Sequence, residues 1–446
     1  MSKDPWIISG AGLVGSLLAV ALGKKGYPVE VYELRQDPRT QTSGEGDRSI
    51  NLALANRGIS ALKAFGVFDL IEPLLIPMSG RMVHRLDGSL DFQRYGQKDF
   101  EVIYSVSRNL LNQRMATAAE QSPNVTLHFG KAVREVDTVG RSITFADGTS
   151  RNYQALIGAD GVGSVVRKAL LGTKEASVTK PLGHSYKELK IYPAPDGSYR
   201  MKKEALHIWA RGEFMLIALP NLDGSFTVTL FLPTEGPQSF AALTDKELVR
   251  QFFAKHFADA LDLMPDLTEQ FFANPTGFLG TISLDKWHQD DSILLIGDAA
   301  HAIVPFHGQG MNCGFEDCEV LLSLLAERKL GSGLFNAFYE LRKPNCDAIA
   351  ELALENYVEM RAKVNEQQFL LQKEIAFILE REFPELFVPR YSLVMFHQVP
   401  YHYALKAGQA HLKILEQLAV GLNKAQDVDL AQAKNLLTKY CPALPS

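Results

Sequence analysis

A glycine-rich turn near the start of the chain constrains the fold more than any other feature. The segment Gly10-Ala11-Gly12-Leu13-Val14-Gly15 follows the apolar run Trp6–Ser9, and a helical pattern over residues 13–25 begins within it. Residues 29–34 then have the composition of a second strand, so the chain opens with a βαβ unit. The glycines permit a tight turn, a close backbone approach to a pyrophosphate and close packing of helix on strand.

An acidic side chain lies at the end of the second predicted strand. Glu33 stands 23 residues after Gly10, where a carboxylate accepts hydrogen bonds from the ribose of a bound dinucleotide. The phosphates would lie at the N-terminus of the first helix. A glycine turn that serves packing alone is the alternative. The residues expected to bind the dinucleotide here are Gly10, Gly12, Leu13, Val14, Gly15, Glu33 and Arg35.

The order of the later elements indicates a discontinuous domain. Helical patterns cover 57–65 and 108–121, residues 132–151 are expected to form a hairpin turning at 146–148, and buried-type strands recur at 155–158 and 292–297. Residues 181–275 are instead rich in aromatic and β-branched strands. We therefore predict an α/β fold, α+β overall, in three parts. These are a Rossmann-type domain of residues 1–180 and 285–345, an antiparallel β substrate domain of residues 181–284, and a C-terminal helical subdomain of residues 346–446.

Composition excludes several classes of protein. With 46% hydrophobic residues, 22% charged residues and a net charge of -5, the chain does not suit a nucleic-acid partner. Its four cysteines predict neither a disulfide framework nor a structural metal, and Cys313 and Cys318 are expected to be small buried residues. No apolar stretch approaches the roughly 20 residues of a membrane span. We expect a cytoplasmic protein without a membrane anchor, either a monomer or a weak homodimer.

Two later segments resemble motifs of the flavoprotein aromatic hydroxylases. They are Gly158-Ala159-Asp160-Gly161, continuing to Arg167, and Gly297-Asp298-Ala299-Ala300-His301. The resemblance implies non-covalent FAD, with Asp298 on its ribityl chain and Asp160 serving both the flavin and a pyridine nucleotide. It also implies that Arg108 lies near the flavin pyrophosphate, although an arginine at a helix start is often a surface ion-pair partner.

A glycine-containing loop follows Asp298. Because the loop over residues 304–312 leads into a helix, its backbone N–H groups and the positive helix end can face the N1 and O2 edge of a flavin. Glycine is needed where backbone lies this close to a ring, and a helix-capping loop is the alternative. The residues expected to line this edge are Ala53, Gly310, Met311 and Asn312, and those expected to act catalytically are Phe306, His307 and Gln309.

Four further segments resemble the kynurenine 3-monooxygenase family, in its soluble bacterial form. They are Gly46–Leu52, Gly80–His84, Gly310–Asp317 and Glu355–Ala362. The resemblance implies that Arg81, Tyr95 and Asn356 hold the carboxylate of an amino-acid substrate and that Tyr391 closes the same end. Glu359 and Met360 lie one helical turn from Asn356 and would support it. Eukaryotic members continue into a C-terminal membrane helix, and this chain ends at Ser446 without one.

An apolar slot is expected for the aromatic ring of the substrate. Ile217, Leu219, Phe231 and Phe306 are the candidates, although a large apolar residue on a strand is first of all a core residue. His307 would contact the ketone or amine of the substrate, and the alternative is a loop histidine satisfied by its own neighbours.

The reaction implied by the resemblance converts L-kynurenine to 3-hydroxykynurenine in tryptophan degradation. NADPH would bind transiently near Asp160 and reduce FAD, O2 would form a C4a-hydroperoxide, and the aminophenyl ring would attack its distal oxygen. The protein would mainly position the reactants and exclude water. Two alternatives remain: a related hydroxylase of another carboxylated aromatic, and a flavin reductase that does not use O2 productively.

Overall fold

The computed structural model describes residues 4–40, 51–172 and 178–443, and the chain divides into two compact units. Unit 1 contains Met1–Leu75, Val106–Leu182 and Gly280–Ala350, and unit 2 contains Ile76–Ser105, Gly183–Leu279 and Glu351–Ser446. This division differs from the predicted one in two respects. Residues 76–105 belong with the second sheet, and the C-terminal helices share a unit with that sheet instead of forming a part of their own.

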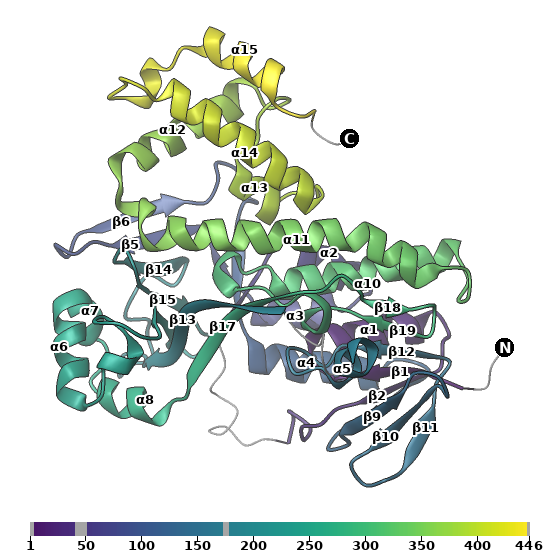
Figure 1. The fold of residues 1–446 in the computed structure, drawn as a ribbon. Helices are drawn as coiled ribbons and strands as arrows, with labels where there is room; N and C mark the ends of the chain where they lie inside the picture. The colour runs from purple at the N-terminus through teal and green to yellow at the C-terminus, as the bar shows by residue number, and fades with distance from the viewer. Residues whose placement is uncertain (1–3, 41–50, 173–177, 444–446) are drawn as a thin grey trace. The chain divides into compact units, whose positions relative to one another are not determined.

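Unit 1 alternates strands and helices (Figure 1). Its strands are β1 (Trp6–Ser9), β2 (Val29–Tyr32), β3 (Asn51–Leu54), β8 (Val125–His128), β9 (Val133–Asp137), β10 (Ser142–Phe145), β11 (Ser150–Asn152), β12 (Ala155–Gly158), β18 (His288–Gln289) and β19 (Ile293–Leu295). Its helices are α1 (Leu13–Lys24), α2 (Asn56–Ala64), α3 (Phe68–Ile71), α4 (Arg108–Glu120), α5 (Val165–Leu171), α9 (Asp298–His301) and α10 (Gly310–Glu327), with short 3-10 turns at Glu72–Leu74 and Pro305–His307.

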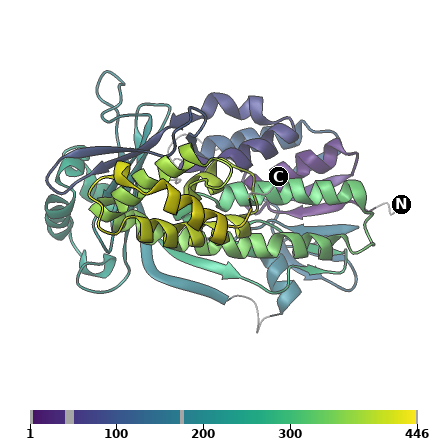
Figure 2. The ribbon, with the colours of Figure 1, turned by 90° about the horizontal axis from the view of Figure 1, so that it is seen from above.

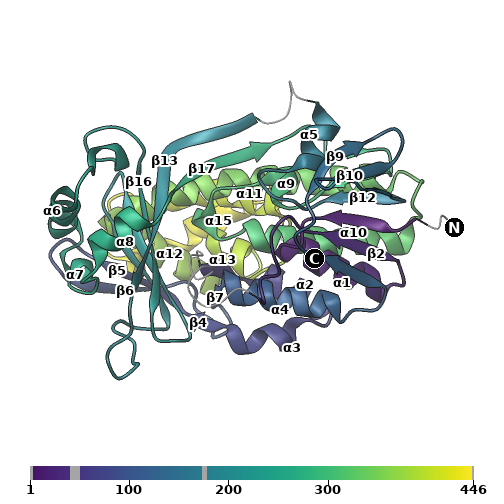
Figure 3. The same cartoon turned by 90° about the horizontal axis from the view of Figure 1, so that it is seen from below.

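The main sheet of unit 1 has the order β18-β19-β12-β1-β2-β8. The strands from β19 to β8 are parallel, and β18 pairs antiparallel at the edge. Because helices cover a parallel sheet on both faces, its strands are apolar throughout, and every residue of β1 and β12 is buried. Figure 3 shows β1, β2 and β12 side by side with α1 next to them. The predicted Rossmann-type arrangement is confirmed.

The predicted hairpin over residues 132–151 is wrong in its number of strands. The segment forms three antiparallel strands in the order β11-β10-β9, with one turn at 146–148 as expected and a second at 138–141. In the second turn Asp137 accepts the N–H groups of Val139 and Gly140, and Arg141 adopts a positive φ of 54°. Asp137 followed three residues later by Gly140 is a turn signal of the same kind as Asp147 and Gly148 in the predicted turn.

Unit 2 combines a large sheet with two groups of helices. Its strands are β4 (Ile76–Met78), β5 (Gly80–His84), β6 (Leu90–Arg94), β14 (Ala205–Ala210), β15 (Met215–Pro220) and β16 (Phe226–Pro233). Its helices are α6 (Lys246–His256), α7 (Ala258–Leu261), α8 (Leu267–Ala273), α12 (Gln367–Glu382), α13 (Arg390–Met395), α14 (Tyr401–Leu418) and α15 (Leu430–Tyr440), with 3-10 turns at Phe240–Ala242, Lys363–Asn365 and Ala425–Asp427. The boundaries between the units fall within or beside β7 (Ile103–Ser107), β13 (Val178–Ile191), β17 (Thr276–Ser283) and α11 (Leu334–Arg361).

The sheet of unit 2 has the order β17-β13-β16-β15-β14-β5-β6. β15 and β16 pair antiparallel, as the predicted antiparallel sheet requires, whereas β5 pairs parallel with β14. One face of the sheet packs against α6, α7 and α8 around Trp209, Phe214 and Leu216. These helices were missed inside the predicted all-strand region, although Val249, Phe252 and Phe253 have the i, i+3, i+4 spacing of a buried helix face.

The helices of the C-terminal segment form a second apolar cluster in unit 2. Ile375 and Leu379 of α12 pack with Ile414 and Leu418 of α14 and with Leu437 of α15. Figure 2 shows these helices gathered together in the yellow and light green part of the chain. Among the helices in the described ranges, none is both long enough and apolar enough to cross a membrane.

A chain of buried polar groups makes unit 2 sensitive to acid. His84 Nε2 lies 2.8 Å from His207 Nδ1, His84 Nδ1 lies 2.6 Å from Asp259, and His207 Nε2 lies 2.8 Å from the Lys202 carbonyl oxygen. Burial lowers the pKa of His207 to about 4, although its bond to Lys202 opposes that effect. His207 is therefore neutral in the folded protein at pH values where the unfolded chain is already protonated.

We expect the free energy of unfolding to fall as the pH is lowered from about 6.5 towards 4, because the unfolded state binds the His207 proton first. The contribution is on the order of 3 kcal/mol. Urea unfolding of the wild type and of His207→Gln should show an advantage of the wild type that shrinks by this amount between pH 7 and pH 4. A difference between the two proteins that does not change with pH would contradict the assignment.

Candidate active site

The predicted dinucleotide motifs meet at one edge of the unit 1 sheet. Gly10 follows β1, Glu33 follows β2, Asp160 follows β12 by two residues and Asp298 follows β19 by three. Because these four strands are parallel neighbours, their carboxyl ends lie at the same edge. This is the edge at which open α/β sheets bind ligands.

The glycine turn adopts the geometry that a phosphate site needs. Gly10 has a φ of 103°, and a Cβ there would lie 2.5 Å from the Ala159 carbonyl oxygen. A Cβ on Gly15 would lie 2.0 Å from the Gly10 carbonyl oxygen, so Gly15 is required by the packing of α1 on the turn. A Cβ on Gly12 would meet no atom within 4 Å. Gly12 is the N-cap of α1 and provides no side-chain cap, so the backbone there faces open space.

Glu33 stabilises the turn from the neighbouring strand. Its Oε2 accepts the N–H of Ala11 at 2.9 Å and its Oε1 accepts the N–H of Arg35 at 2.9 Å. The carboxylate is thereby held beside the glycine turn, and each oxygen keeps capacity for a ribose hydroxyl. Arg35 also pairs with Glu33 at 3.2 Å, but its side chain is 74% exposed.

Asp160 has the environment of a ligand-binding carboxylate. Its Oδ2 accepts the N–H of Val165 at 2.8 Å at the start of α5, whereas its buried Oδ1 has no hydrogen-bond partner among the described residues. Burial raises the pKa of Asp160 above its usual value. A buried acceptor without a partner is costly unless a ligand donates to it.

Arg167 lies at the end of the Asp160 motif and connects this motif to the Asp298 motif. It was not predicted as a site residue. Its buried guanidinium donates to the carbonyl oxygens of Ala299 at 2.9 Å and Gly161 at 3.4 Å, and also to that of Val162. The Asp160 turn and the Asp298 turn are thus held at a defined separation. A basic residue three positions after the N-cap Ser164 was the available signal for this role.

The second half of the flavin constellation lies on α9, the loop after it and α10. Asp298 is exposed at the first position of α9, and its Oδ1 lies 3.9 Å from where a Cβ on Gly310 would be. Gly310 and Met311 begin α10, which has no side-chain cap. Phe306, His307 and Gln309 are all buried in the connecting loop.

Asn312 has its side-chain amide fully engaged within the protein. Its Nδ2 donates to the carbonyl oxygens of Ala53 and Gly308 at 2.9 and 2.8 Å, and its Oδ1 accepts the N–H of Ala55 at 2.9 Å. Asn312 therefore joins the start of α10 to the segment after β3 through its side chain, which leaves its backbone as the part that can face a ligand. Ala53 belongs to this joint and contacts the position of Gly308.

Two predicted features have less structural support in unit 1. Arg108 is exposed at the first position of α4, whose N-cap is Ser107, and no ion pair of its guanidinium is described. The segment 46–50 of the family motif lies outside the described residues, and only Asn51 and Leu52 of that motif are placed.

FAD suits the residues gathered at this edge. The open backbone at Gly12 can take a pyrophosphate, Glu33 can accept from a ribose, and Asp298 offers an exposed carboxylate to ribityl hydroxyls beside the uncapped start of α10. The buried Oδ1 of Asp160 supplies one more acceptor. Together these residues would contact both halves of a dinucleotide. A nucleotide with a single phosphate would leave some of them without a ligand contact.

A second constellation is confined to unit 2 and centres on Arg81. The buried guanidinium lies 3.1 Å from Glu359 Oε1 and 3.4 Å from Asn356 Oδ1, both on α11. Its Cζ is 5.7 Å from the ring centre of Tyr95 and 5.2 Å from that of Tyr391. These two rings stack at 5.0 Å. The structure therefore brings Arg81, Tyr95, Asn356 and Tyr391 together, as predicted.

Several charged side chains surround Arg81. Burial disfavours ionisation of Glu359, but Arg81 and Arg390 keep its pKa below the usual value. Arg390 pairs with Glu355 and lies 3.8 Å from Glu359. Lys373, whose pKa is lowered to about 8 by burial and by Arg81, adds a third cation. The surroundings of Arg81 thus contain charges of both signs, with Asp91 as a further carboxylate near Lys373.

Arg390 and Lys373 were not predicted as site residues. Both lie on short or amphipathic helices of the C-terminal segment, where a basic residue is ordinarily a solvent-facing one. Met360 accepts a hydrogen bond from Asn356 Nδ2 at 3.3 Å through its sulfur, so the supporting role predicted for it has a geometric basis. Glu359 has a larger part than predicted, because it is the direct ion-pair partner of Arg81.

The predicted apolar slot lies on the same sheet face as Arg81. Ile217 pairs with Thr229 and Ile208, and Phe231 pairs with Met215, so Ile217, Leu219 and Phe231 share one face by strand alternation. Val83 pairs with Ile208, which places Arg81, two residues earlier, on this face as well. None of these residues belongs to the cluster that packs on α6, α7 and α8. Phe306, the fourth predicted slot residue, belongs to unit 1.

Comparisons with known proteins define the class and then the family. The FAD binding domain family matches residues 5–335, and the chain is an FAD-dependent flavoprotein monooxygenase. A kynurenine 3-monooxygenase of Myxococcus xanthus is 46% identical over 441 residues, which cover 98% of this chain and 95% of that one. One of Dictyostelium discoideum is 42% identical and covers 98% of each. The chain belongs to the kynurenine 3-monooxygenase family.

Solved structures support the fold. PqsL of P. aeruginosa, in complex with 2-aminobenzoylacetate, has a TM-score of 0.65 and 21% identity, covering 80% of this chain and 97% of its own. The tetrameric form of 2-methyl-3-hydroxypyridine-5-carboxylic acid oxygenase has a TM-score of 0.66 and 18% identity, covering 83% and 96%. At this level of identity the likeness concerns the fold alone.

Proposed function

We propose that this chain converts L-kynurenine, NADPH, a proton and O2 into 3-hydroxykynurenine, NADP⁺ and water. The observation that carries the choice of substrate is the buried Arg81 with its ring of Tyr95, Asn356 and Tyr391 in unit 2. A buried guanidinium with one side facing an amide and two phenols suits a carboxylate, which a planar fork binds through two hydrogen bonds.

The substrate carries a carboxylate and an ammonium group on one carbon, and both find partners near Arg81. Arg81, Tyr95 and Asn356 bind the carboxylate in this proposal, with Tyr391 stacked on Tyr95 to close that end. Glu359 keeps Arg81 in place through the 3.1 Å contact of its Oε1 and offers its other carboxylate oxygen to the ammonium group of the substrate. Met360 supports Asn356 through its sulfur.

The aminophenyl ring lies in this proposal on the face formed by Ile217, Leu219 and Phe231. These three side chains make the face apolar, and an apolar face offers contact area to an aromatic ring. Leu219 and Phe231 are buried, and Ile217 is partly exposed. In unit 1, Phe306 and His307 are proposed as catalytic residues, with Phe306 excluding water and His307 hydrogen-bonding the ketone or amine of the reactant. Gln309 would orient the loop that carries them.

FAD, when bound, supplies the activation of O2, and residues of unit 1 bind it. The pyrophosphate of FAD is bound by the glycine turn, namely Gly10, Gly12, Leu13, Val14 and Gly15. Its adenosine ribose is bound by Glu33 and Arg35. Arg108 lies near the phosphates, and Asp298 binds the ribityl chain. The backbone of Ala53, Gly310, Met311 and Asn312 borders the ring in this proposal. The open backbone at Gly12 and the exposed carboxylate of Asp298 support these assignments.

NADPH is proposed to bind transiently near Asp160, whose buried Oδ1 has no partner among the described residues. The sequence offers no second glycine fingerprint for a resident pyridine nucleotide. We further propose that the protein is cytoplasmic and acts as a monomer or weak homodimer. The four free cysteines support the first of these statements.

The deciding assay follows NADPH oxidation by the purified yellow protein with and without L-kynurenine, with the product identified by mass spectrometry. We expect L-kynurenine to accelerate NADPH oxidation and one 3-hydroxykynurenine to form for each NADPH consumed. Acceleration without hydroxylated product would indicate a reductase. No acceleration by L-kynurenine, together with turnover of another carboxylated aromatic, would transfer the proposal to that substrate.

A further inference from the structure

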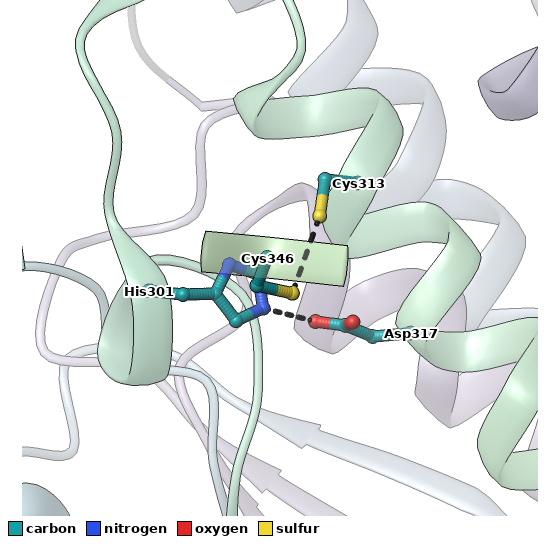
Figure 4. A group of neighbouring side chains, drawn as sticks. All are labelled: His301, Cys313, Asp317 and Cys346. Carbon is teal, nitrogen blue, oxygen red and sulfur yellow. Dashed lines mark hydrogen bonds and ion pairs between the residues drawn. The ribbon is translucent and has the colours of Figure 1, made fainter. Parts of the chain in front are cut away.

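Two cysteines far apart in the sequence meet in the interior of unit 1. Cys313 on α10 and Cys346 on α11 place their sulfur atoms 3.6 Å apart, and both residues are buried. Figure 4 shows them together with His301 of α9 and Asp317 of α10, and the facing atoms of the four side chains all lie within 4.8 Å of one another. Neither the flavin site nor the Arg81 site uses this pair.

We propose that Cys313 and Cys346 are a peroxide-oxidised thiol pair, in which Cys313 is attacked first and Cys346 closes the disulfide. The sulfur atoms need to approach by only about 1.5 Å to reach the roughly 2.05 Å of a disulfide bond. The inference concerns side chains of unit 1 and does not depend on the substrate proposed above.

The surroundings of Cys313 favour its thiolate. Arg342 Nη2 lies 3.2 Å from the Cys313 sulfur, and Cys313 is the fourth residue of the 18-residue helix α10, where the helix dipole also favours negative charge. The hydrogen bond with Cys346, together with Arg342 and His301, keeps the pKa of Cys313 below its usual value against the effect of burial. Burial raises the pKa of Cys346 well above its usual value, so Cys346 remains a thiol.

The charged side chains around Cys313 also favour its thiolate. Burial disfavours a charged imidazole, but Asp317, 2.7 Å from His301 Nε2, raises the pKa of His301 to about 9. The protonated His301 and Arg342 then face Asp317 and Glu316, while Arg57 makes a further ion pair with Glu316. Arg342 and the protonated His301 are the cations that favour the Cys313 thiolate, and Glu319 is a third carboxylate near Arg57 and Arg342.

A metal ion fits these four residues less well. Asp317 Oδ2 already accepts the N–H of Gly297 at 2.9 Å and contacts His301, and its Oδ1 accepts from Arg342 at 2.8 Å. The guanidinium also lies against the Cys313 sulfur, where it would repel a cation. The donor atoms are thus engaged by hydrogen-bond donors that a metal would have to displace.

The oxidation balances with hydrogen peroxide as the oxidant. The Cys313 thiolate attacks one peroxide oxygen, the O–O bond breaks, and a hydroxide ion leaves, which gives a sulfenic acid at Cys313. Cys346 then attacks the Cys313 sulfur and the S–O bond breaks; the leaving hydroxide takes the Cys346 thiol proton and becomes one water. The hydroxide ion released in the first step takes the proton that Cys313 lost on forming its thiolate and becomes the second water. Two thiol equivalents are oxidised and one peroxide is reduced. Because both sulfurs are buried, a small uncharged oxidant is favoured over a bulky disulfide reagent.

The experiment treats the intact protein with a modest excess of hydrogen peroxide, then counts thiols after denaturation and maps the bridge by mass spectrometry. Free thiols should fall from four to two per chain, with a Cys313–Cys346 cross-link that a reducing agent removes. In Cys346→Ala the reaction should stop at Cys313, where dimedone labels the sulfenic acid. In Cys313→Ala the Cys346 thiol should stay unlabelled.

Cys318 and Cys441 are the internal controls. Cys318 is buried on the same helix, and burial raises its pKa well above the usual value, so it should remain unmodified; Cys441→Ser removes the half-buried cysteine and should not alter the cross-link. Oxidation confined to Cys318 or Cys441, labelling of Cys346 before Cys313, or zinc bound in stoichiometric amount and lost in Cys313→Ala would each overturn the proposal. Thiol counts and mass spectra do not involve turnover, so failure of the substrate assignment leaves this test intact.

Discussion

Replacement of Arg81 by methionine is expected to lower kcat/KM for L-kynurenine by about 10²- to 10³-fold, chiefly through KM, because one partner of a buried charged contact is removed. Methionine keeps much of the side-chain volume, so the loss reflects the guanidinium. The FAD content of the protein should not change, since Arg81 lies in unit 2 and the predicted flavin residues lie in unit 1. Steady-state kinetics and the flavin absorbance of the purified variant measure both quantities.

A substrate that lacks the carboxyl group distinguishes a loss of carboxylate recognition from general damage to the enzyme. The amine obtained by decarboxylation of L-kynurenine should be a poor substrate of the wild type, and Arg81→Met should lose little further activity towards it, as in a double-mutant cycle. Arg85→Met is the matched control, because Arg85 directly follows β5 and pairs with the partly exposed Asp91 at 2.9 Å. If Arg81→Met lost equal factors for both substrates, Arg81 would not bind the carboxylate.

The second large effect concerns substitutions of two glycines of the turn, Gly12 and Gly15, which should impair the protein for different reasons. Gly12→Ala is expected to fold like the wild type, because a Cβ there meets no protein atom within 4 Å, yet to bind FAD about 10- to 100-fold more weakly. The added methyl group would occupy space that a pyrophosphate needs. Gly15→Ala is expected to lose several kcal/mol of stability, because its Cβ would lie 2.0 Å from a backbone oxygen that cannot move freely.

Urea unfolding of the FAD-free proteins and flavin titration distinguish the two cases. The unfolding midpoint of Gly12→Ala should match that of the wild type to within the small cost of changing an N-cap residue, and only its FAD affinity should fall. Gly15→Ala should be destabilised with or without FAD. Wild-type FAD affinity in Gly12→Ala would show that the pyrophosphate lies elsewhere.

The site could be predicted from the sequence where local pattern and chemistry agree. The strand, turn and helix of residues 6–24 have a local signature, so the glycine turn and Glu33 could be placed before the fold was known. The Arg81 group was named through family resemblance, since nothing in the spacing of Arg81, Asn356 and Tyr391 brings them together. The sequence pattern does not predict the helices α6, α7 and α8, because their aromatic residues are equally typical of strands.

The sequence by itself determined the parallel α/β unit, its glycine turn and the expectation of a bound dinucleotide, because these depend on the backbone freedom of glycine and on short-range periodicity. Only the tertiary structure decided which motifs meet at the carboxyl edge of the sheet, that Arg81 lies on the face opposite α6–α8, and that Cys313 lies 3.6 Å from Cys346. Those relations depend on strand order, strand register and the packing of distant helices, which no local run of residues encodes.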